Sequence, residues 1–334
     1  MKQWLAACIL VGVNVLPAWA ADEKPEQVLR DLHEFFRKCA LPDGSFRPGI
    51  DAEYEGISDS AYSDLAPTCY AVIIHKTFGW KLPDEAKTKA FLLGRQRKDG
   101  SFFNVKGTVD PDSPDGKAYN TTMALMALRA LGAKPRYNPL PVFDAVLEED
   151  YKKLPAYMTS FFPMAYLCSG KSIPPEADKK IKALMVQDKD GWMHDHIAAT
   201  FHAAHYYRLI NEPTPKADAM VAKTMRVQKP DGSWMLNLPS RDRHAGFDAC
   251  FILKQLGKDT PEVKKSLARA AAWALECRNA DGGFGHYPGS TSDIDACFFQ
   301  IGTLVMAGWL PVADPLPAQP HLLGWGHLMP APKK

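Results

Sequence analysis

The sequence predicts an all-α fold in which helical hairpins close into a ring, an α/α toroid. A short turn of Asp, Gly and a following aromatic residue occurs five times, at Asp43, Asp99, Asp190, Asp231 and Asp281. The stretches between the turns have the apolar spacing of helices, and the period-two alternation typical of strands is not evident. A recurring turn between helical stretches is the mark of a repeat architecture.

The spacing of the turns predicts six repeats. Successive turns lie 41 to 56 residues apart, except for one interval of 91 residues between Asp99 and Asp190. That interval holds two further helical stretches, 140–154 and 158–170, without the turn signature. It therefore counts as two units, one of them degenerate.

Each unit has two kinds of helix. The first is amphipathic, as in "EVKKSLARAAAWALECR" at 262–278, and the second is more apolar, as in "NTTMALMALRALG" at 120–132. Gly132 and Gly257 suit the left-handed position after a helix end. Because an all-apolar helix is buried and an amphipathic one has a wet face, we expect six apolar helices inside and six amphipathic helices outside.

The turns themselves are interpreted as structural. Asp-Gly favours a tight turn, and the aromatic residue after it can wedge between units. Three units carry a Gln three residues before the Asp, where its amide can tie one outer helix to its neighbour: Gln96, Gln187 and Gln228.

The two ends of the chain differ from the repeats. An apolar run followed by Ala18-Trp19-Ala20 predicts a signal peptide at 1–20, cleaved after Ala20, with an uncleaved anchor as the alternative. We therefore expect an exported protein, periplasmic or secreted, with the toroid at 21–313 and no membrane span after cleavage. The Pro-rich segment 314–334 cannot continue a helix, and Leu322, Leu323, Trp325 and Leu328 suggest an extended strap lying on the ring.

Composition narrows the classes of function. Hydrophobic residues make up 46% and charged residues 23%, the balance of a folded globular chain, and a net charge of +2 gives no reason to expect nucleic acid as a partner. Six cysteines follow the predicted cleavage site, which permits disulfides in an exported chain. Their scatter through apolar helical stretches favours free, buried thiols instead.

The repeat resembles that of the superfamily formed by protein prenyltransferases and terpenoid (squalene) cyclases, which are α/α toroids. The resemblance lies in Gln-x-x-Asp-Gly-Ser-Trp/Phe and covers about residues 27 to 310 at the repeat level. "CRNADGGFGHYPG" at 277–289 and "LAPTCYAV" at 65–72 are similar to stretches of prenyltransferase β-subunits. The resemblance implies an isoprenoid or other apolar substrate in the central cavity.

Polar residues gather in sequence where the inner helices begin, which is one mouth of the ring. Counting thirteen residues back from Gly308 and Gly257 gives Asp295 and His244, and their neighbours two residues earlier are Asp293 and Asp242. The same register adds His196 and Asp64. A second register pairs Asp248 with Asp295, and the sequence leaves both registers open.

The resemblance implies two roles for Asp293-Ile294-Asp295. Prenyltransferase β-subunits carry Asp-x-Cys at this place and bind zinc there, so Asp293, Asp295, His244 and His196 are candidate metal ligands. Zinc is the possible cofactor, although a carboxylate replaces the thiolate. Class II cyclases carry Asp-x-Asp-Asp, whose middle Asp protonates an alkene. Asp295 fits that position, while Ala296 replaces the last Asp, and the candidate catalytic acids are Asp295, Asp293 and Asp242.

A carbocation would need aromatic faces beside it. The candidate substrate-binding residues are Tyr119, Phe201, Phe247, Phe251 and Phe298. For all these residues a structural interpretation stands beside the functional one. Asp242 and Asp293 suit helix N-caps, His202 and His205 suit a packed helix, and the aromatics suit a core.

Three functions remain open. The first is an exported prenyltransferase-like or cyclase-like enzyme that acts on an isoprenoid or other apolar, lipid-like molecule. The second is a toroid that binds a ligand or protein without catalysis, and the third is a secreted toroid acting on polysaccharide with paired acids. A partner of the α-subunit type is not expected, because protein prenylation needs cytosolic substrates.

Overall fold

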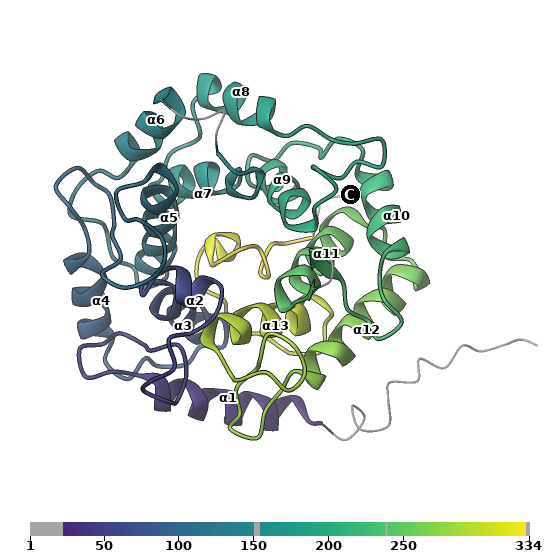
Figure 1. The fold of residues 1–334 in the computed structure, drawn as a ribbon, viewed down its shortest axis with the longest axis horizontal. Helices are drawn as coiled ribbons and strands as arrows, with labels where there is room; N and C mark the ends of the chain where they lie inside the picture. The colour runs from purple at the N-terminus through teal and green to yellow at the C-terminus, as the bar shows by residue number, and fades with distance from the viewer. Residues whose placement is uncertain (1–22, 150–153, 238–239, 332–334) are drawn as a thin grey trace, which may run out of the picture.

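The computed structural model describes residues 23–149, 154–237 and 240–331, and the predicted signal peptide lies outside them. Helices of an outer ring alternate along the chain with helices of an inner ring (Figure 1). The outer helices are α1 (Pro25–Cys39), α4 (Glu85–Gly94), α6 (Leu140–Glu149), α8 (Pro175–Leu184), α10 (Ala217–Arg226) and α12 (Pro261–Glu276). The inner helices are α3 (Ala66–Thr77), α5 (Pro114–Ala130), α7 (Phe161–Cys168), α9 (Ile197–Leu209), α11 (Arg243–Leu256) and α13 (Ile294–Met306).

The inner ring is closed. Each inner helix packs against the next along the chain, and α13 packs against α3 to complete the circle. The predicted α/α toroid of six hairpins is confirmed, and the degenerate unit supplies α6 and α7. Short elements decorate the ring: α2 (Asp59–Tyr62), two 3₁₀ turns at Ala156–Met158 and Pro320–Leu322, and a hairpin of β1 (Met235–Asn237) with β2 (Ser240–Arg241).

Burial explains which helix lies in which ring. In α13 every residue except Val305 is buried, and in α3 every residue except Lys76. In α1 the buried residues form one stripe, Val28, Leu32, Phe35, Phe36 and Cys39, and the opposite face is wet. The apolar helices therefore surround the centre, as their sequences predict.

The repeated turns link neighbouring units. The side chain of Gln228 donates to the carbonyl oxygens of Gly232, in its own turn, and Ser266, in the next outer helix, both at 3.0 Å. Gln96 and Gln187 make the equivalent pairs of bonds. The last unit uses Arg278 instead, which pairs with Glu23 at 2.6 Å and with Asp31 of α1. This ion-pair cluster joins the sixth unit to the first.

The described residues hold no helix long and apolar enough to cross a membrane. The six cysteines after the predicted cleavage site are free thiols, and five of them are buried. The burial of these five agrees with their interpretation as small buried hydrophobes, and Cys168 is half-buried.

The strap is described over residues 314–331, and its segment 322–329 lies in the centre of the ring, where Figure 1 shows the C-terminal part of the chain in yellow. Side chains near the C-terminal ends of the inner helices hold it. Thr77 Oγ1 lies 2.8 Å from His327 Nε2, Gln255 donates to the Met329 carbonyl at 3.1 Å, and Arg208 donates to the Pro330 carbonyl at 3.1 Å. The strap therefore enters the ring from the opening opposite the mouth.

Candidate functional site

The mouth of the ring is formed by the N-terminal ends of the inner helices. Asp293, Asp242 and His196 are the N-caps of α13, α11 and α9, and each side chain accepts a hydrogen bond from a backbone N–H in the first turn. Equivalent caps on three helices support the first of the two sequence registers. Asp248 instead lies within α11 and is buried.

Asp293 does more than cap its helix, because a distant segment converges on it. Its Oδ2 accepts from the Tyr54 hydroxyl at 3.0 Å and from the Ile57 N–H at 3.1 Å. Its Oδ1 accepts from the Ser60 hydroxyl at 2.5 Å and from the Asp295 N–H at 2.9 Å. These four donors satisfy both oxygens of the fully buried carboxylate. Burial, together with the charge of Asp293, raises the pKa of Tyr54, which keeps its proton for this bond.

Asp295 lies in the first turn of α13 and is fully buried. Its Oδ2 accepts from the backbone N–H of Asp59 at 2.8 Å, which fixes the start of α2 against the mouth. The carboxyl of Asp59 in turn accepts a short hydrogen bond from the Tyr70 hydroxyl of α3. Asp59 therefore links Asp295 to Tyr70, whose side chain belongs to the inner wall of the ring.

His286 joins this group and was not predicted as a site residue. Its Nε2 lies 3.7 Å from Asp293 Oδ2, and its Nδ1 lies 3.7 Å from Asp242 Oδ2. His286 is in the loop before α13, within the stretch that carries the family resemblance. From the sequence this stretch is interpreted as a turn, and nothing in it indicates that the side chain of His286 contacts the start of α13.

Candidate ligand atoms of His286, Asp293 and Asp295 lie within 4.8 Å of one another. Zinc needs ligand atoms with free lone pairs. Each oxygen of Asp293 already accepts two hydrogen bonds, so this carboxylate can bind zinc only after losing donors. The arrangement present here does not fit a zinc centre.

The other predicted polar residues lie near the mouth with different neighbours. The ring of His244 packs edge-on against Phe299 at 4.5 Å, and its Nδ1 lies 3.8 Å from Asp248. His196 caps α9, and Asp64 pairs with Arg95 at 2.9 Å. Among the described residues, the candidate metal cluster contains His286 in place of His244 and His196.

The predicted substrate-binding aromatics line the inside of the ring and are buried: Tyr119, Phe201, Phe247, Phe251 and Phe298. Tyr70 stacks on Phe298, with ring centroids 4.3 Å apart. The strap occupies the space that these side chains surround. Gly324 approaches Phe298, and Gly326 approaches Phe251, so closely that a Cβ atom at either glycine would lie within 3.0 Å of the ring.

Trp325 contacts residues in the N-terminal halves of two inner helices, Phe161 of α7 and Tyr70 of α3. It stacks on Phe161 at 4.6 Å, and its Nε1 donates to the Tyr70 hydroxyl at 3.3 Å. Two buried histidines of α9 flank it, His202 at 5.7 Å and His205 at 6.4 Å between ring centroids. Burial lowers the pKa of both histidines, to about 3 for His205, so both are neutral beside the strap.

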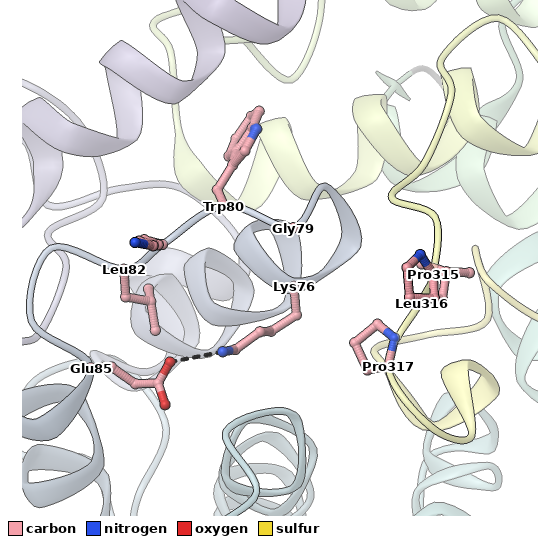
Figure 2. Close-up of a pocket in the computed structure, with 9 residues that line it drawn as sticks. Lys76, Gly79, Trp80, Leu82, Glu85, Pro315, Leu316 and Pro317 are labelled. Atoms are coloured by element: carbon pink, nitrogen blue, oxygen red, sulfur yellow. Dashed lines mark hydrogen bonds and ion pairs between the residues drawn. The ribbon is translucent and has the colours of Figure 1, made fainter.

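A groove of about 610 Å³ lies outside the ring, between the α3–α4 connection and the start of the strap. Figure 2 shows Trp80 and Leu82 on one side and Pro315, Leu316 and Pro317 on the other. Lys76 and Glu85, which border it, pair with each other at 2.8 Å. The groove is separate from the acids and contains none of the predicted site residues.

The model of the protein family described as the prenyltransferase alpha-alpha toroid domain matches residues 1–160 and 164–328. No curated protein sequence matches the chain. Protein geranylgeranyltransferase-I of Candida albicans, complexed with GGPP, is similar in structure, with a TM-score of 0.52, 14% identity, and coverage of 75% of this chain and 87% of that one.

Two further structures are similar to about the same degree. A type II terpene cyclase from Scytonema, in complex with its product merosterolic acid A, has a TM-score of 0.53, 15% identity, and coverage of 86% of this chain and 99% of that one. A protein from Actinoplanes has a TM-score of 0.53, 16% identity, and coverage of 85% and 98%. At this level of identity the likeness concerns the fold.

Proposed function

The chain belongs to the prenyltransferase alpha-alpha toroid family, and on that premise we propose an exported protein that binds an isoprenoid-like apolar molecule in its ring and isomerises it by acid catalysis at Asp295. The observation that carries the proposal is the position of Asp295. Asp295 lies at the mouth of the ring. A single residue, Asp59, connects it by hydrogen bonds to Tyr70, which packs against Phe298 and Phe299 in the aromatic wall of the ring.

The two aspartates have different tasks in this proposal. Asp293 is held in place by four hydrogen bonds, and Asp295, the second carboxyl at the mouth, is the group that donates the proton in this proposal. His286 lies between Asp293 and Asp242, and Asp242 is the more exposed of the two, with 16% of its side chain accessible. This arrangement supports a route by which a proton returns from the rim.

The reaction is a proton-initiated rearrangement. Asp295 gives its proton to one carbon of an alkene, whose π electrons form the new C–H bond and leave a tertiary cation. A second alkene attacks the cation, and loss of a proton elsewhere gives a neutral product with the mass of the substrate. Aromatic faces such as Phe298 and Phe299 stabilise positive charge by their quadrupoles. Transfer of a prenyl group by zinc is not proposed, because the zinc ligands do not fit.

A non-catalytic binding toroid is the alternative, and one observation favours it. The strap packs against the aromatic side chains that a substrate would contact, so the chain itself occupies the interior of the ring. The polysaccharide alternative needs a groove lined by exposed tryptophans. Among the described residues four tryptophans are buried, Trp192, Trp234, Trp273 and Trp325, and Trp80 and Trp309 are half-buried. The groove that Trp80 borders is lined by one acid, Glu85, and not by a pair, so we do not propose this function.

The decisive experiment incubates the purified mature protein with squalene and with geranylgeraniol and searches for products of unchanged mass with fewer alkene protons. We expect such a product from the wild type and its loss in Asp295→Asn. Asp218→Asn, at a side chain 88% exposed on α10, is the matched control. Turnover that survives in Asp295→Asn would refute the assigned acid. A lack of product from every probe, also with Trp325→Ala, would favour the binding toroid.

Export is proposed from the N-terminal sequence. The test is the mass of the mature N-terminus after expression with the full leader, which should begin at Ala21. A protein that retains Met1 in the cytosolic fraction would contradict it.

A further inference from the structure

The segment 322–329 of the strap occupies the ring as a ligand would. Leu322, Leu323 and Trp325 are each at most 3% exposed, and Trp325 is enclosed by aromatic rings of the inner helices. The glycines on either side of it, Gly324 and Gly326, have positive φ and lie against Phe298 and Phe251. The contacts of this segment therefore indicate which chemical groups a ligand bound in the ring can present.

Trp325 makes one hydrogen bond inside the ring, whereas the polar contacts of His327 and Met329 lie near the C-terminal ends of the inner helices. The Tyr70 hydroxyl gives its single proton to the carboxylate of Asp59, and it accepts the Nε1–H of Trp325 at 3.3 Å. A phenolic hydroxyl has one hydrogen to donate, so the open position at Tyr70 is an acceptor. Burial and the nearby charge of Asp59 raise the pKa of Tyr70 well above its usual range, so the hydroxyl keeps its proton.

We propose that the ring takes an apolar molecule that carries a hydrogen-bond donor, an isoprenoid alcohol by chemical class, whose hydroxyl replaces Trp325 at Tyr70 as the strap withdraws. The inference rests on the proposed binding of an isoprenoid-like molecule in the ring. It adds the polar group of that molecule and the competitor that it displaces. Tyr70 acts here as a specificity residue, and no catalytic step is assigned to it.

The hydrogen bond that the Tyr70 hydroxyl can accept distinguishes one class of ligand from another. An alcohol can donate to the phenolic oxygen and so replaces the hydrogen bond that Trp325 gives to Tyr70. A methyl ether, a ketone or a phosphate oxygen only accepts, so it would leave Tyr70 without its donor or force it to release Asp59. A hydrocarbon leaves the same lone pair buried and unpaired.

The strap is anchored in a way that suits displacement. Its backbone is held by single hydrogen bonds from Arg208 and Gln255, near the ends of α9 and α11, and His327 contacts Thr77 at the end of α3. These bonds lie at the opening opposite the acids, and the strap groups that they satisfy can pair with water after withdrawal. Trp325 contributes the stacking and the single bond inside the ring.

The test measures binding of geranylgeraniol and its methyl ether by equilibrium dialysis, with wild type, Tyr70→Phe and Trp325→Phe. We expect the wild type to bind the alcohol about tenfold more tightly than the ether. Tyr70→Phe should abolish that difference. Trp325→Phe keeps the stacking and loses the N–H, so it should tighten binding of both probes by the same factor.

Tyr206→Phe is the matched control, since Tyr206 is also buried and also donates to a carboxylate, Asp178, at 2.5 Å. It lies on the outer side of α9 and should leave the preference unchanged. If Tyr70→Phe does not fold, Trp325→Phe and the two probes on the wild type still decide the question.

Two results would overturn the inference: equal binding of alcohol and ether by the wild type, or no binding of either probe even with Trp325→Ala. The second result would also refute ring binding itself. A tenfold preference without any product would support the inference and contradict only the acid role of Asp295. Turnover of both probes, bound with equal affinity, would support the acid role of Asp295 and contradict the inference about Tyr70.

Discussion

The indole Nε1 of Trp325 lies 3.3 Å from the phenolic oxygen of Tyr70, although 255 positions separate the two residues in the chain. The bond joins the middle of the strap to α3, the first inner helix of the ring. Because Tyr70 also donates to Asp59, and the Asp59 backbone donates to Asp295, the strap is connected to the acids at the mouth.

Replacement of Asp293 by Asn should destabilise the protein strongly. The Asn amide nitrogen would face hydrogen-bond donors at a place where the Asp293 carboxylate now accepts four hydrogen bonds. We therefore expect the free energy of unfolding to fall by about 2 to 4 kcal/mol. Urea denaturation measures it. Asp84→Asn, an exposed cap of α4, is the control and should change stability far less. An unchanged midpoint for Asp293→Asn would contradict the anchoring role.

Removal of the Trp325 side chain should release the strap. Trp325→Ala loses the stacking on Phe161 and the bond to Tyr70, so proteinase K should cleave the strap at least tenfold faster, the effect of about 1.4 kcal/mol of lost docking energy. Trp309→Ala, at a half-buried position outside the ring, should leave the cleavage rate near that of wild type. Equal rates in the two variants would show that Trp325 does not hold the strap.

Acidification should also loosen the strap. Burial lowers the pKa of His205 and of His327 to about 3. A solvated His titrates near 6.5, so the docked state is fully stable above about pH 6.5 and loses stability as the pH falls toward 3, because only the released state binds protons there. His321 and Arg208 near His205 further oppose its protonation.

We expect strap cleavage to accelerate between pH 7.5 and pH 5, after normalisation to an unstructured peptide. The double variant His205→Phe, His327→Phe should weaken this dependence, because His202 is then the remaining buried histidine beside Trp325 that can bind a proton on release. A flat profile in the wild type would contradict the prediction.

The turn glycines should be intolerant of a side chain. Gly232 has φ +95°, and a Cβ there would lie 2.2 Å from the Arg269 carbonyl oxygen of α12, so Gly232→Ala should cost about 2 kcal/mol or more. Gly94 at the end of α4 has open space around it, and Gly94→Ala should stabilise by about 0.5 to 1 kcal/mol. Thermal denaturation of the pair measures both, and a Gly232→Ala protein as stable as Gly94→Ala would contradict the close approach.

Zinc should have no effect on the protein. Since both oxygens of Asp293 are engaged, added zinc should leave the melting temperature unchanged, and EDTA should not lower it. Stoichiometric zinc in the purified protein that disappears in His286→Ala would overturn this expectation.

Several parts of the site could be predicted because they repeat. The helix starts lie a fixed distance from the helix-ending glycines, so Asp293, Asp242 and His196 emerge as equivalent positions, and all three are N-caps. The segment 54–60 belongs to no repeat, which is why its convergence on Asp293 escaped the sequence. The same holds for His286, whose loop has no counterpart to compare with.

By itself the sequence determined the ring and the set of residues at its mouth, because turn chemistry, helical periodicity and capping are local and recur in every unit. Only the tertiary structure decided which carboxylate is saturated with donors, that His286 joins the acids, and that the strap enters the ring rather than resting on it. The donors on Asp293 and the docking of the strap depend on contacts between residues more than two hundred positions apart, and His286 contacts Asp242 across 44 positions. Over such separations packing and hydrogen-bond pairing select among partners that no local pattern distinguishes.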